Sequence, residues 1–548
     1  MTRTKLYLAL IFVGAAVLNI LDIGWGLPNR ERIYSYKGDE HTFLIRLNRL
    51  NPGQFDFDPD YYWKPHLNVY YTGAVLKAGQ LLGIYKIGDR EYYKKYPREF
   101  RKVILWQRIF WGKIPLLFLV WISFLIGKLI KSEKFGLAFA AVTGILPTFL
   151  VNGNYGVENI VIPLLSALVF FFSLKYHRSG AWRDIILAGV VCGLAASTKQ
   201  SGLLSFVFIL GAVFTRRKTV PKARLWGHLA AAGIFACLSF SLTSPFYMKF
   251  LVLKVFSPAL VKPDLHGSTS LPMDIFHREG GSVFPGIWRL LRIHFVQLGG
   301  VIFLCVPFGI FSNRKDPRVR WAVWYVLVFF GISLFVLYST DSRLTPLAYV
   351  LSFLGILGLF FFLEKPLSPW LKRGIVVVAA VSLLSYAIAI EVFFLKPGTR
   401  EISSRWIEKQ LLSRGKISLG LHEDPGYAHP DVLTREWRHF TPGNEKYYPN
   451  DYQERFIIPD FELRELGVPD VLPQKNLETR AMKQRWLESQ APEYIILTHD
   501  LLDWPEYFLH SPHYTLVKHF RPFGWLGINQ LSLVKPEVYV FKRRKALE

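Results

Sequence analysis

The sequence predicts an α-helical polytopic membrane protein with a polar domain at its C-terminal end. The chain of 548 residues is 51% hydrophobic, and its mean hydropathy of +0.23 is high for a protein that is 20% charged. Its apolar residues gather in blocks of about 15–20 residues, the length that a helix needs to cross a hydrocarbon core of roughly 30 Å. Short basic clusters separate many of these blocks. These observations favour membrane spans over the core of a soluble protein.

About eleven transmembrane helices are expected, with the N-terminus in the cytoplasm. The first helix follows Arg3 and Lys5, and we interpret it as an uncleaved span because no convincing small-residue cleavage site follows it. The segment 185–214 is interpreted as a short helical hairpin. The expected spans lie near residues 6–24, 104–130, 135–151, 160–174, 185–197, 200–214, 227–246, 293–311, 321–339, 344–363 and 374–395.

The net charge of +25 would suggest nucleic-acid binding in a soluble protein. Here many basic residues stand between apolar blocks, as the positive-inside rule expects for cytoplasmic loops. No soluble module combines a basic stripe with base-stacking aromatic residues, so the sequence argues against a nucleic-acid partner. The basic clusters are Lys131 and Lys134; Lys175, Arg178 and Arg183; Arg216, Arg217, Lys218, Lys222 and Arg224; Arg314, Lys315, Arg318 and Arg320; Lys365, Lys372 and Arg373.

Three long segments fall on the opposite, extracytoplasmic face: 25–103, 247–292 and 396–548. We therefore expect a transmembrane domain over residues 1–395 and a C-terminal soluble domain over residues 396–548.

The C-terminal segment is polar and rich in proline, and it predicts a small α/β or α+β domain because it contains β-type runs at Lys416–Leu421, Tyr494–Leu497 and Val538–Phe541. Aromatic residues of the first long loop suit the lipid headgroup level, so amphipathic interfacial helices are expected there. These residues are Tyr61, Tyr62, Trp63, Tyr70 and Tyr71.

Five polar or charged groups stand at span ends, and the expected topology places all five on the extracytoplasmic face. Charged side chains at membrane depth are costly and usually have a partner or a function. A single carboxylate there is commonly a solvated cap and a single lysine a snorkelling side chain, so only the convergence of five groups favours a functional site. The groups are Gly38-Asp39-Glu40; Asn154-Tyr155-Gly156-Val157-Glu158; Thr198-Lys199-Gln200; Lys262, Asp264, His266, His277 and Arg278; and Asp341-Ser342-Arg343.

These residue types meet the needs of sugar transfer from a phosphorylated lipid. A carboxylate can remove the proton of an acceptor hydroxyl as it attacks the anomeric carbon. Lysine and arginine can stabilise the charge that develops on a phosphate leaving group. No metal or other cofactor is expected, because the segment 56–60 is interpreted as a solvated turn and His266 and His277 lack a second close ligand. His266 is interpreted as a phosphate or sugar contact.

In order along residues 1–395, several short motifs resemble the GT-C glycosyltransferases of the protein O-mannosyltransferase and aminoarabinose-transferase type, which use polyprenyl-phosphate sugars. Gly38-Asp39-Glu40 resembles the acidic pair of their first extracytoplasmic loop, and Trp63-Lys64-Pro65-His66-Leu67-Asn68-Val69-Tyr70-Tyr71 resembles the stretch that follows it. The other matching segments are Arg108, Gly193-Leu194-Ala195-Ala196-Ser197-Thr198-Lys199, Asp341-Ser342-Arg343-Leu344-Thr345-Pro346-Leu347 and, in the tail, Val538-Tyr539-Val540-Phe541-Lys542.

The resemblance implies a GT-C fold and an inverting transfer of a sugar from a polyprenyl-phosphate donor to an acceptor outside the cytoplasm. It implies Asp39 as the general base, Glu40 as its neighbour, and Glu158 as a second acidic residue, although aspartate is commoner at that position. Lys199 and Arg343 would bind the donor phosphate. The remaining expected substrate-binding residues are Lys64, His66, Tyr155, His266 and Asp341.

Three alternatives remain open at this stage. A transporter or flippase of lipid-linked sugars would also gather charges in a membrane, although transport needs access from both faces with sites near the midplane. A polysaccharide ligase or polymerase would use a diphosphate lipid donor, and a non-catalytic scaffold would need no donor. The acceptor could be a protein, a lipid or a glycan. Because the chain has no Asn-x-Ser/Thr sequon, a prokaryotic plasma membrane is the expected location.

Overall fold

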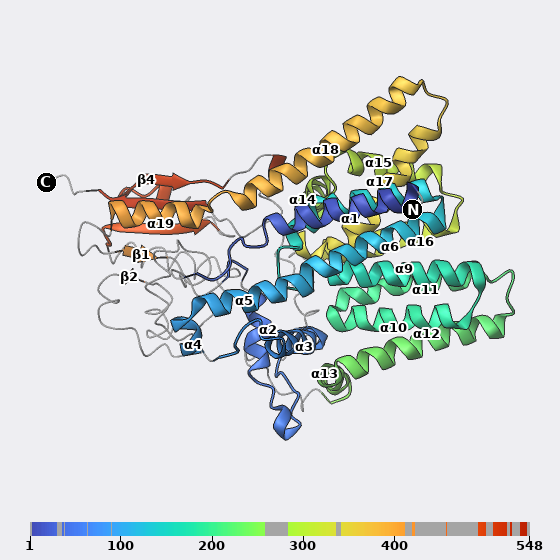
Figure 1. Cartoon of the computed structure of the whole chain (residues 1–548), viewed down its shortest axis with the longest axis horizontal. Helices are drawn as coiled ribbons and strands as arrows, with labels where there is room; N and C mark the ends of the chain where they lie inside the picture. Colours follow the sequence, from blue (N-terminus) through green and yellow to red (C-terminus); the bar gives the residue numbers. More distant parts are fainter. Residues whose placement is uncertain are drawn as a thin grey trace.

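The structure is a computed structural model, and it forms a bundle of helices with a small sheet at one end (Figure 1). It describes residues 3–29, 35–37, 39–62, 64–88, 90–257, 283–335, 341–411, 419–421, 456–457, 491–499, 508–522, 526–528 and 537–544. The predicted fold class, a polytopic α-helical membrane protein with a small C-terminal sheet, is confirmed.

The described part of each of the eleven ranges in which a span was expected is mainly helical. Within the described residues, six helices are long and apolar enough to cross a membrane on their own. These are α1 (Arg3–Leu21), the continuous α5 and α6 (Pro97–Arg108 and Ile114–Ile130), α9 (Val161–Ser179), α12 (Lys222–Thr243), α17 (Thr345–Glu364) and α18 (Pro369–Leu395).

Helices that are not both long and apolar enough to count as spans on their own occupy the other expected spans. They are α7 (Glu133–Ile145) and α8 (Pro147–Asn152), α10 (Trp182–Thr198), α11 (Phe206–Thr215), α14 (Val283–Gln297), α15 (Val301–Ser312) and α16 (Pro317–Phe335). The axes of α14 and α15 bend by 106° and would together make a seventh span. Gly299 and Gly300 form the bend with φ of +68° and +70°, a conformation that glycine adopts without steric cost.

Small residues allow the spans to pack closely. A Cβ atom on Gly309 of α15 would lie 1.9 Å from the Leu354 carbonyl oxygen of α17, and one on Gly358 would lie 1.9 Å from the Cys305 carbonyl oxygen. Glycine at a helix crossing lets two backbones approach, which is a common way to associate helices where lipid removes the hydrophobic driving force. The bundle is therefore a tightly packed scaffold for the loops at its ends.

The loops that carry the basic clusters meet at one end of the bundle. Lys131 pairs with Glu364 at 2.7 Å, and Arg216 donates to the His177 carbonyl at 2.8 Å. The N-terminus lies at this end, and the C-terminal sheet lies at the other (Figure 1). The basic loops thus share one face, and the positive-inside rule predicts that this face is cytoplasmic.

Short helices and the sheet occupy the opposite end. The first long loop contains α2 (Asp39–Leu47), α3 (Leu67–Leu81) and α4 (Arg90–Lys95), and α13 (Pro245–Phe256) follows α12. Helices α2, α3 and α13 run across the direction of the spans (Figure 1). Some aromatic residues expected at headgroup level instead hold these helices together: Tyr61 is buried beneath the Arg46 guanidinium, and the Tyr71 hydroxyl donates to the Phe110 carbonyl at 3.1 Å.

The C-terminal sheet has the strand order β2-β1-β3-β5-β4. Strand β1 (Leu419–Leu421) pairs in parallel with β2 (Phe456–Ile457) and β3 (Tyr494–His499). Strand β5 (Glu537–Arg543) pairs antiparallel with β3 and with β4 (Tyr514–Phe520). Helix α19 (Thr399–Gln410) packs on this sheet, where the Trp406 and Phe520 rings lie 5.9 Å apart. Three of these strands occupy the described parts of the β-type runs in the sequence.

Candidate active site

Helix α2 begins with two adjacent carboxylates, and their side chains have different surroundings. Asp39 and Glu40 occupy the first turn, where the helix dipole favours negative charge. Consecutive helical residues are rotated by about 100°, so the two side chains cannot face the same partner. Glu40 is completely buried, whereas 53% of the Asp39 side-chain surface remains exposed.

Glu40 is held by a set of matched donors. The Arg108 guanidinium donates to both carboxylate oxygens of Glu40, at 2.7 and 3.1 Å, and the Gly156 backbone N–H donates at 2.7 Å. Arg108 also donates to the carbonyl oxygens of Ile23 and Trp25. Burial alone would raise the pKa of Glu40, but the charge and hydrogen bonds of Arg108 outweigh it and keep the pKa below its usual value. This pair fastens the first loop to α5 and to the segment after α8.

Asp39 lies among cations. Its carboxylate is 3.5 Å from the Lys37 ammonium, and Lys37 also lies over the Tyr155 ring at 5.3 Å. The loss of surrounding water would raise the pKa of Asp39, but the charges of Lys64, Lys37 and Lys199 outweigh this effect and lower the pKa to about 2. Asp39 is therefore an exposed, ionised carboxylate in a positively charged environment.

Glu158 lies between two lysines. One of its carboxylate oxygens is 3.0 Å from the Lys64 ammonium and 3.8 Å from the Lys199 ammonium. The other oxygen, Oε2, is buried without a hydrogen-bond partner among the described residues. Burial would raise the pKa of Glu158, but Lys64 and Lys199 lower it below its usual value. The residue is thus a buried anion that holds two cations close to Asp39.

The two lysines differ in how firmly they hold their protons. Burial would lower the pKa of Lys64, but the neighbouring Glu158 and Asp39 raise it above its usual value. For Lys199, burial dominates, and the charges of Lys64 and Arg343 add to it, so that the pKa falls to about 8 despite Glu158. Of these two lysines, Lys199 is therefore the one that loses its charge first as the pH rises.

The end of helix α10 places Lys199. The helix ends at Thr198, and Lys199 continues in an extended conformation with φ of −160° before the 3₁₀ turn Gln200–Ser205. Asn68 of α3 donates to the Thr198 carbonyl at 2.8 Å, and Gln200 donates to the Tyr247 hydroxyl at 2.8 Å. These bonds lock the chain on both sides of Lys199.

A chain of buried hydrogen bonds holds the segment after α8 against the start of α17. Asn152 donates to the Thr148 carbonyl at 2.9 Å, and Asn159 donates to the Asn152 side chain at 2.9 Å. The Thr345 hydroxyl donates to the Asn159 carbonyl at 2.8 Å. Because Glu158 precedes Asn159 and an exposed Arg343 precedes Thr345 by two residues, this chain places both charged residues at the same end of the bundle.

Other expected site residues have different surroundings. His66 begins α3, is fully buried, and has its ring Nε2 2.8 Å from the Tyr61 carbonyl oxygen. Burial lowers its pKa to about 4, so it is neutral at physiological pH. Its backbone N–H donates to the Ser244 hydroxyl at 3.0 Å, which joins α3 to the start of α13. The structure thus surrounds His66 with backbone and aromatic groups.

Part of the expected site lies outside the described residues. This part comprises Gly38, Trp63, the side chain of Asp341, and residues 258–282, which include Lys262, Asp264, His266, His277 and Arg278. The backbone of Asp341 and Arg343 forms a 3₁₀ turn immediately before α17.

The sequence did not single out a second buried charge group. A π-helical turn, Ile109–Lys113, interrupts α5 and α6. Residues five apart lie about 140° apart around an α-helix but share a face in a π turn, so Lys113 points to the same side as Arg108. Lys113 donates to Asn154 at 2.5 Å and lies 3.7 Å from Asp22, which accepts a hydrogen bond from Asn154. The sequence feature that could have indicated this group is a lysine, Lys113, that follows Arg108 by five residues inside an apolar block.

No group of three or more His, Cys, Asp or Glu side chains in the described part of the chain could hold a metal ion. The three aspartates of the segment 56–60 form successive turns, in which Asp56 accepts from the Asp58 N–H at 3.1 Å and Asp58 from the Asp60 N–H at 3.0 Å. Asp58 also accepts from the Tyr62 hydroxyl at 2.7 Å. The carboxylates of Asp56 and Asp58 are thus used in local hydrogen bonds.

The bundle with its small C-terminal sheet has the GT-C fold, which solved membrane glycosyltransferases also have. The archaeal oligosaccharyltransferase AglB from Archaeoglobus fulgidus, in complex with an inhibitory peptide and a dolichol-phosphate, is similar over 100% of this chain and 75% of its own, with a TM-score of 0.50 and 11% identity. ArnT from Cupriavidus metallidurans bound to undecaprenyl phosphate matches 98% of both chains, with a TM-score of 0.43 and 15% identity.

The arabinofuranosyltransferase AftD from Mycobacteria is similar over 99% of this chain and 42% of its own, with a TM-score of 0.44 and 14% identity. No protein-family description and no curated protein sequence matches the chain. At these identities the likeness shows the fold, and the function must be argued from the site.

Proposed function

We propose that this protein is a glycosyltransferase that moves a sugar from a polyprenyl-phosphate-linked donor to an acceptor hydroxyl on the extracytoplasmic side of the membrane. The observation that carries the proposal is the exposed, ionised Asp39 beside Lys64 and Lys199. A carboxylate and two lysines stand together at the end of the bundle that lies opposite the basic loops, where they would serve as base and as phosphate-binding groups. The segment 396–548 would lie in the same aqueous compartment as Asp39.

The charge of the described site suits the leaving group. Lys37, Lys64, Lys199 and Arg343 supply four positive charges, and Asp39 and Glu158 supply two negative ones, so positive charge exceeds negative by two. A polyprenyl-phosphoryl sugar carries one negative charge, and the phosphate monoester that it releases carries up to two. The site therefore complements the product of bond cleavage better than the substrate, which is the condition for lowering the barrier.

In the proposed reaction, the acceptor oxygen forms a bond to the anomeric carbon while the bond from that carbon to the phosphate oxygen breaks. The acceptor proton moves to an Asp39 carboxylate oxygen, and the electron pair of the broken bond leaves on the polyprenyl phosphate. Attack opposite the leaving group inverts the anomeric carbon. Lys199 and Arg343 hold the phosphate, and the isoprenoid chain lies along the bilayer, so that positioning supplies part of the rate.

Donor binding would also make Asp39 a better base. A pKa of about 2 is low for proton abstraction near neutral pH, where the most effective base has a pKa near the operating pH. The lysines that lower this pKa are the same groups that would pair with the donor phosphate. Their charge would be offset when the donor binds, and the pKa of Asp39 would then rise. This arrangement couples base strength to the presence of the donor.

Lipid mass spectrometry on host cells with and without the gene tests the proposal. Cells without the gene are expected to accumulate a sugar linked to a polyprenyl monophosphate. Accumulation of a diphosphate-linked sugar would instead support a ligase or polymerase. Purified protein in liposomes would also be tested for movement of labelled donor across the membrane. Such movement, with no sugar transfer to an envelope extract, would support a transporter and contradict the proposal.

A further inference from the structure

A polar cavity of about 650 Å³ lies between the first loop, helix α5 and helix α19. One wall is the chain from Gly24 to Leu27 together with Tyr36, and Arg101 of α5 stands beside it. The link between α18 and α19 closes another side. The volume falls within the range of roughly 300–1,000 Å³ that is usual for small-ligand sites.

One face of α19 lines this cavity. Glu401, Ser404, Arg405 and Glu408 recur at the spacing of three, four and seven residues that defines a single helical stripe. The guanidinium of Arg405 pairs with Glu401 at 2.5 Å. Another side of the helix faces the sheet through Trp406, so the lining stripe is not needed to attach α19 to the strands.

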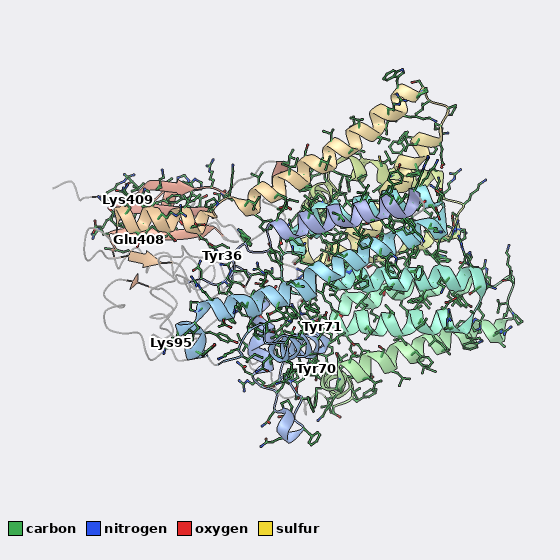
Figure 2. The ribbon with its side chains drawn as sticks, in the orientation of Figure 1. Tyr36, Tyr70, Tyr71, Lys95, Glu408 and Lys409 are labelled. Carbon is green, nitrogen blue, oxygen red and sulfur yellow. The ribbon has the colours of Figure 1, made fainter. Side chains whose placement is uncertain are left out.

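The cavity is close to the site but separate from it. Tyr36 lies in the wall, and its position between α19, with Glu408 and Lys409, and the helices of the first loop is visible in Figure 2. Lys37, the next residue, pairs with Asp39. Since consecutive Cα atoms are 3.8 Å apart, the Cα atoms of Tyr36 and Asp39 are at most about 11 Å apart. A ligand with an extended chain of hydroxyl groups could therefore lie in the cavity and reach Asp39.

The lining chemistry fits a carbohydrate. Carboxylates accept and guanidinium groups donate, so a wall that alternates the two can bind hydroxyl groups, each of which both donates and accepts. The lining charges are nearly balanced, with Arg101, Lys396 and Arg405 against Glu401 and Glu408, which disfavours a strongly anionic ligand. The cavity lies beside the start of α5. Helices α5 and α6 together comprise 34 residues and are about 50 Å long, so they extend beyond a membrane hydrocarbon core of roughly 30 Å. The lining also includes the apolar residues Trp25, Leu27, Phe394 and Leu395, but charged side chains stand among them and interrupt the apolar surface that a lipid chain would need.

We propose that this cavity is an acceptor subsite, which holds the carbohydrate part of the acceptor beyond the hydroxyl that reacts. The inference rests on the proposed glycosyl transfer and specifies its acceptor: a molecule that carries a short, nearly neutral chain of sugars. Arg101 and the α19 stripe orient this chain, and Asp39 meets the reactive hydroxyl at its end. The C-terminal segment thus contributes, through α19, to the choice of acceptor.

Two pairs of neighbouring residues provide matched variants. Glu408 lines the cavity and Lys409 does not, and Arg101 lines it whereas Lys102 does not. In a Cys237→Ala background, which removes the exposed native cysteine, Glu408→Cys and Lys409→Cys would each be labelled with a maleimide that carries a polyethylene glycol chain. Arg101→Gln and Lys102→Gln test the opposite wall without a label.

The assay uses radiolabelled polyprenyl-phosphate sugar and, as acceptor, graded amounts of envelope extract from cells that lack the gene. The labelled Glu408→Cys protein and Arg101→Gln are expected to raise the acceptor KM by about tenfold or more, the effect of losing one hydrogen bond between a charged side chain and the ligand, with kcat little changed. The labelled Lys409→Cys protein and Lys102→Gln are expected to behave like the wild type.

Three results would overturn the inference. An unchanged acceptor KM in both cavity variants would show that the acceptor does not enter the cavity. Loss of acceptor capacity after protease digestion of the extract would identify a peptide occupant in place of a carbohydrate. Absence of donor turnover in the wild type, with or without extract, would show that the proposed function has failed and this inference with it. The first result leaves the proposed function standing, so the two failures are distinguishable.

Discussion

Asp39 and Glu40 are neighbours in the sequence and in the first turn of α2, yet their surroundings are opposite. Glu40 is fully buried and accepts hydrogen bonds from the Arg108 guanidinium and from the Gly156 backbone N–H. Asp39 is half exposed, and its nearest described cation is 3.5 Å away. A fully buried carboxylate with matched donors cannot take up a proton without breaking a buried ion pair, whereas Asp39 is half exposed and two of its neighbouring lysines pair with Glu158 instead. The comparison teaches that packing divides an acidic pair into one structural and one available group.

The largest expected effect comes from neutralising the available carboxylate. Asp39→Asn keeps the size of the side chain and should lower sugar transfer by about 10²–10⁴-fold, the range typical of a missing general base. Donor affinity should hold or rise, since the lysines lose a competing negative charge. Single-turnover assays of purified enzyme measure the rate, and donor titration measures the affinity. A wild-type rate in Asp39→Asn together with an inactive Glu158→Gln would identify Glu158 as the base.

Neutralising the buried partner should affect folding before chemistry. Glu40→Gln leaves the Arg108 guanidinium without its counter-charge in a completely buried position, which typically destabilises a protein by about 3–5 kcal/mol. Thermal unfolding in detergent should show the loss, and the double variant Glu40→Gln with Arg108→Gln should recover part of it. If Glu40→Gln were as stable as the wild type but unable to transfer sugar, the two carboxylates would share the catalytic proton.

The lysines around Asp39 predict that donor turnover depends on pH. The pKa of Lys199 is lowered to about 8, so its ammonium is charged below this pH and neutral above it. Because only the charged form attracts a phosphate, kcat/KM for the donor should fall as the pH rises through about 8. Lys199→Gln should cost about 1.5–3 kcal/mol, roughly 10–100-fold, at pH 7. Lys199→Arg should move the fall to higher pH, and an unshifted profile would assign the titration to another group.

The smallest effect is expected from removing the hydrogen bond between Thr345 and Asn159, which joins two segments of the site. Thr345→Val removes the hydroxyl that donates to the Asn159 carbonyl, a loss of about 1 kcal/mol for a buried hydrogen bond. The donor kcat/KM should fall by less than tenfold, and Thr345→Ser should restore it. A loss as large as that of Asp39→Asn would mean that this bond positions the reacting groups directly.

The sequence was sufficient to predict the fold, because hydrophobic blocks of spanning length and the charge of the intervening loops constrain a membrane protein strongly. The same topology led to the expectation that Asp39, Glu158 and Lys199 gather at one end, and the structure places them together. Lys64 was also predicted as a site residue, from its place in a motif, and its ammonium forms an ion pair with Glu158. Each of these residues stands next to a predicted span. Because the charges of the loops determine the direction of each span, they also determine the end of the bundle at which each residue lies.

The partners of each residue could not be predicted in the same way. Nothing local distinguishes Asp39 from Glu40, since the difference depends on Arg108, which lies 68 residues away from Glu40. Lys37 was passed over because a lysine in a polar loop carries no signal of its own. Lys113 was missed because an α-helical periodicity places it away from Arg108, and only the π turn brings the two to one side.

The π turn also affects how this chain must be aligned with others. Its five residues occupy the place that four residues take in an ordinary α-helix, so it corresponds to one residue inserted within a span. A relative with an unbroken helix here is expected to carry its two cations four positions apart, on the same face. An alignment that forbids gaps inside membrane spans would then match Lys113 to the wrong residue and shift one side of the helix by one position. The motifs after it would seem less similar than they are.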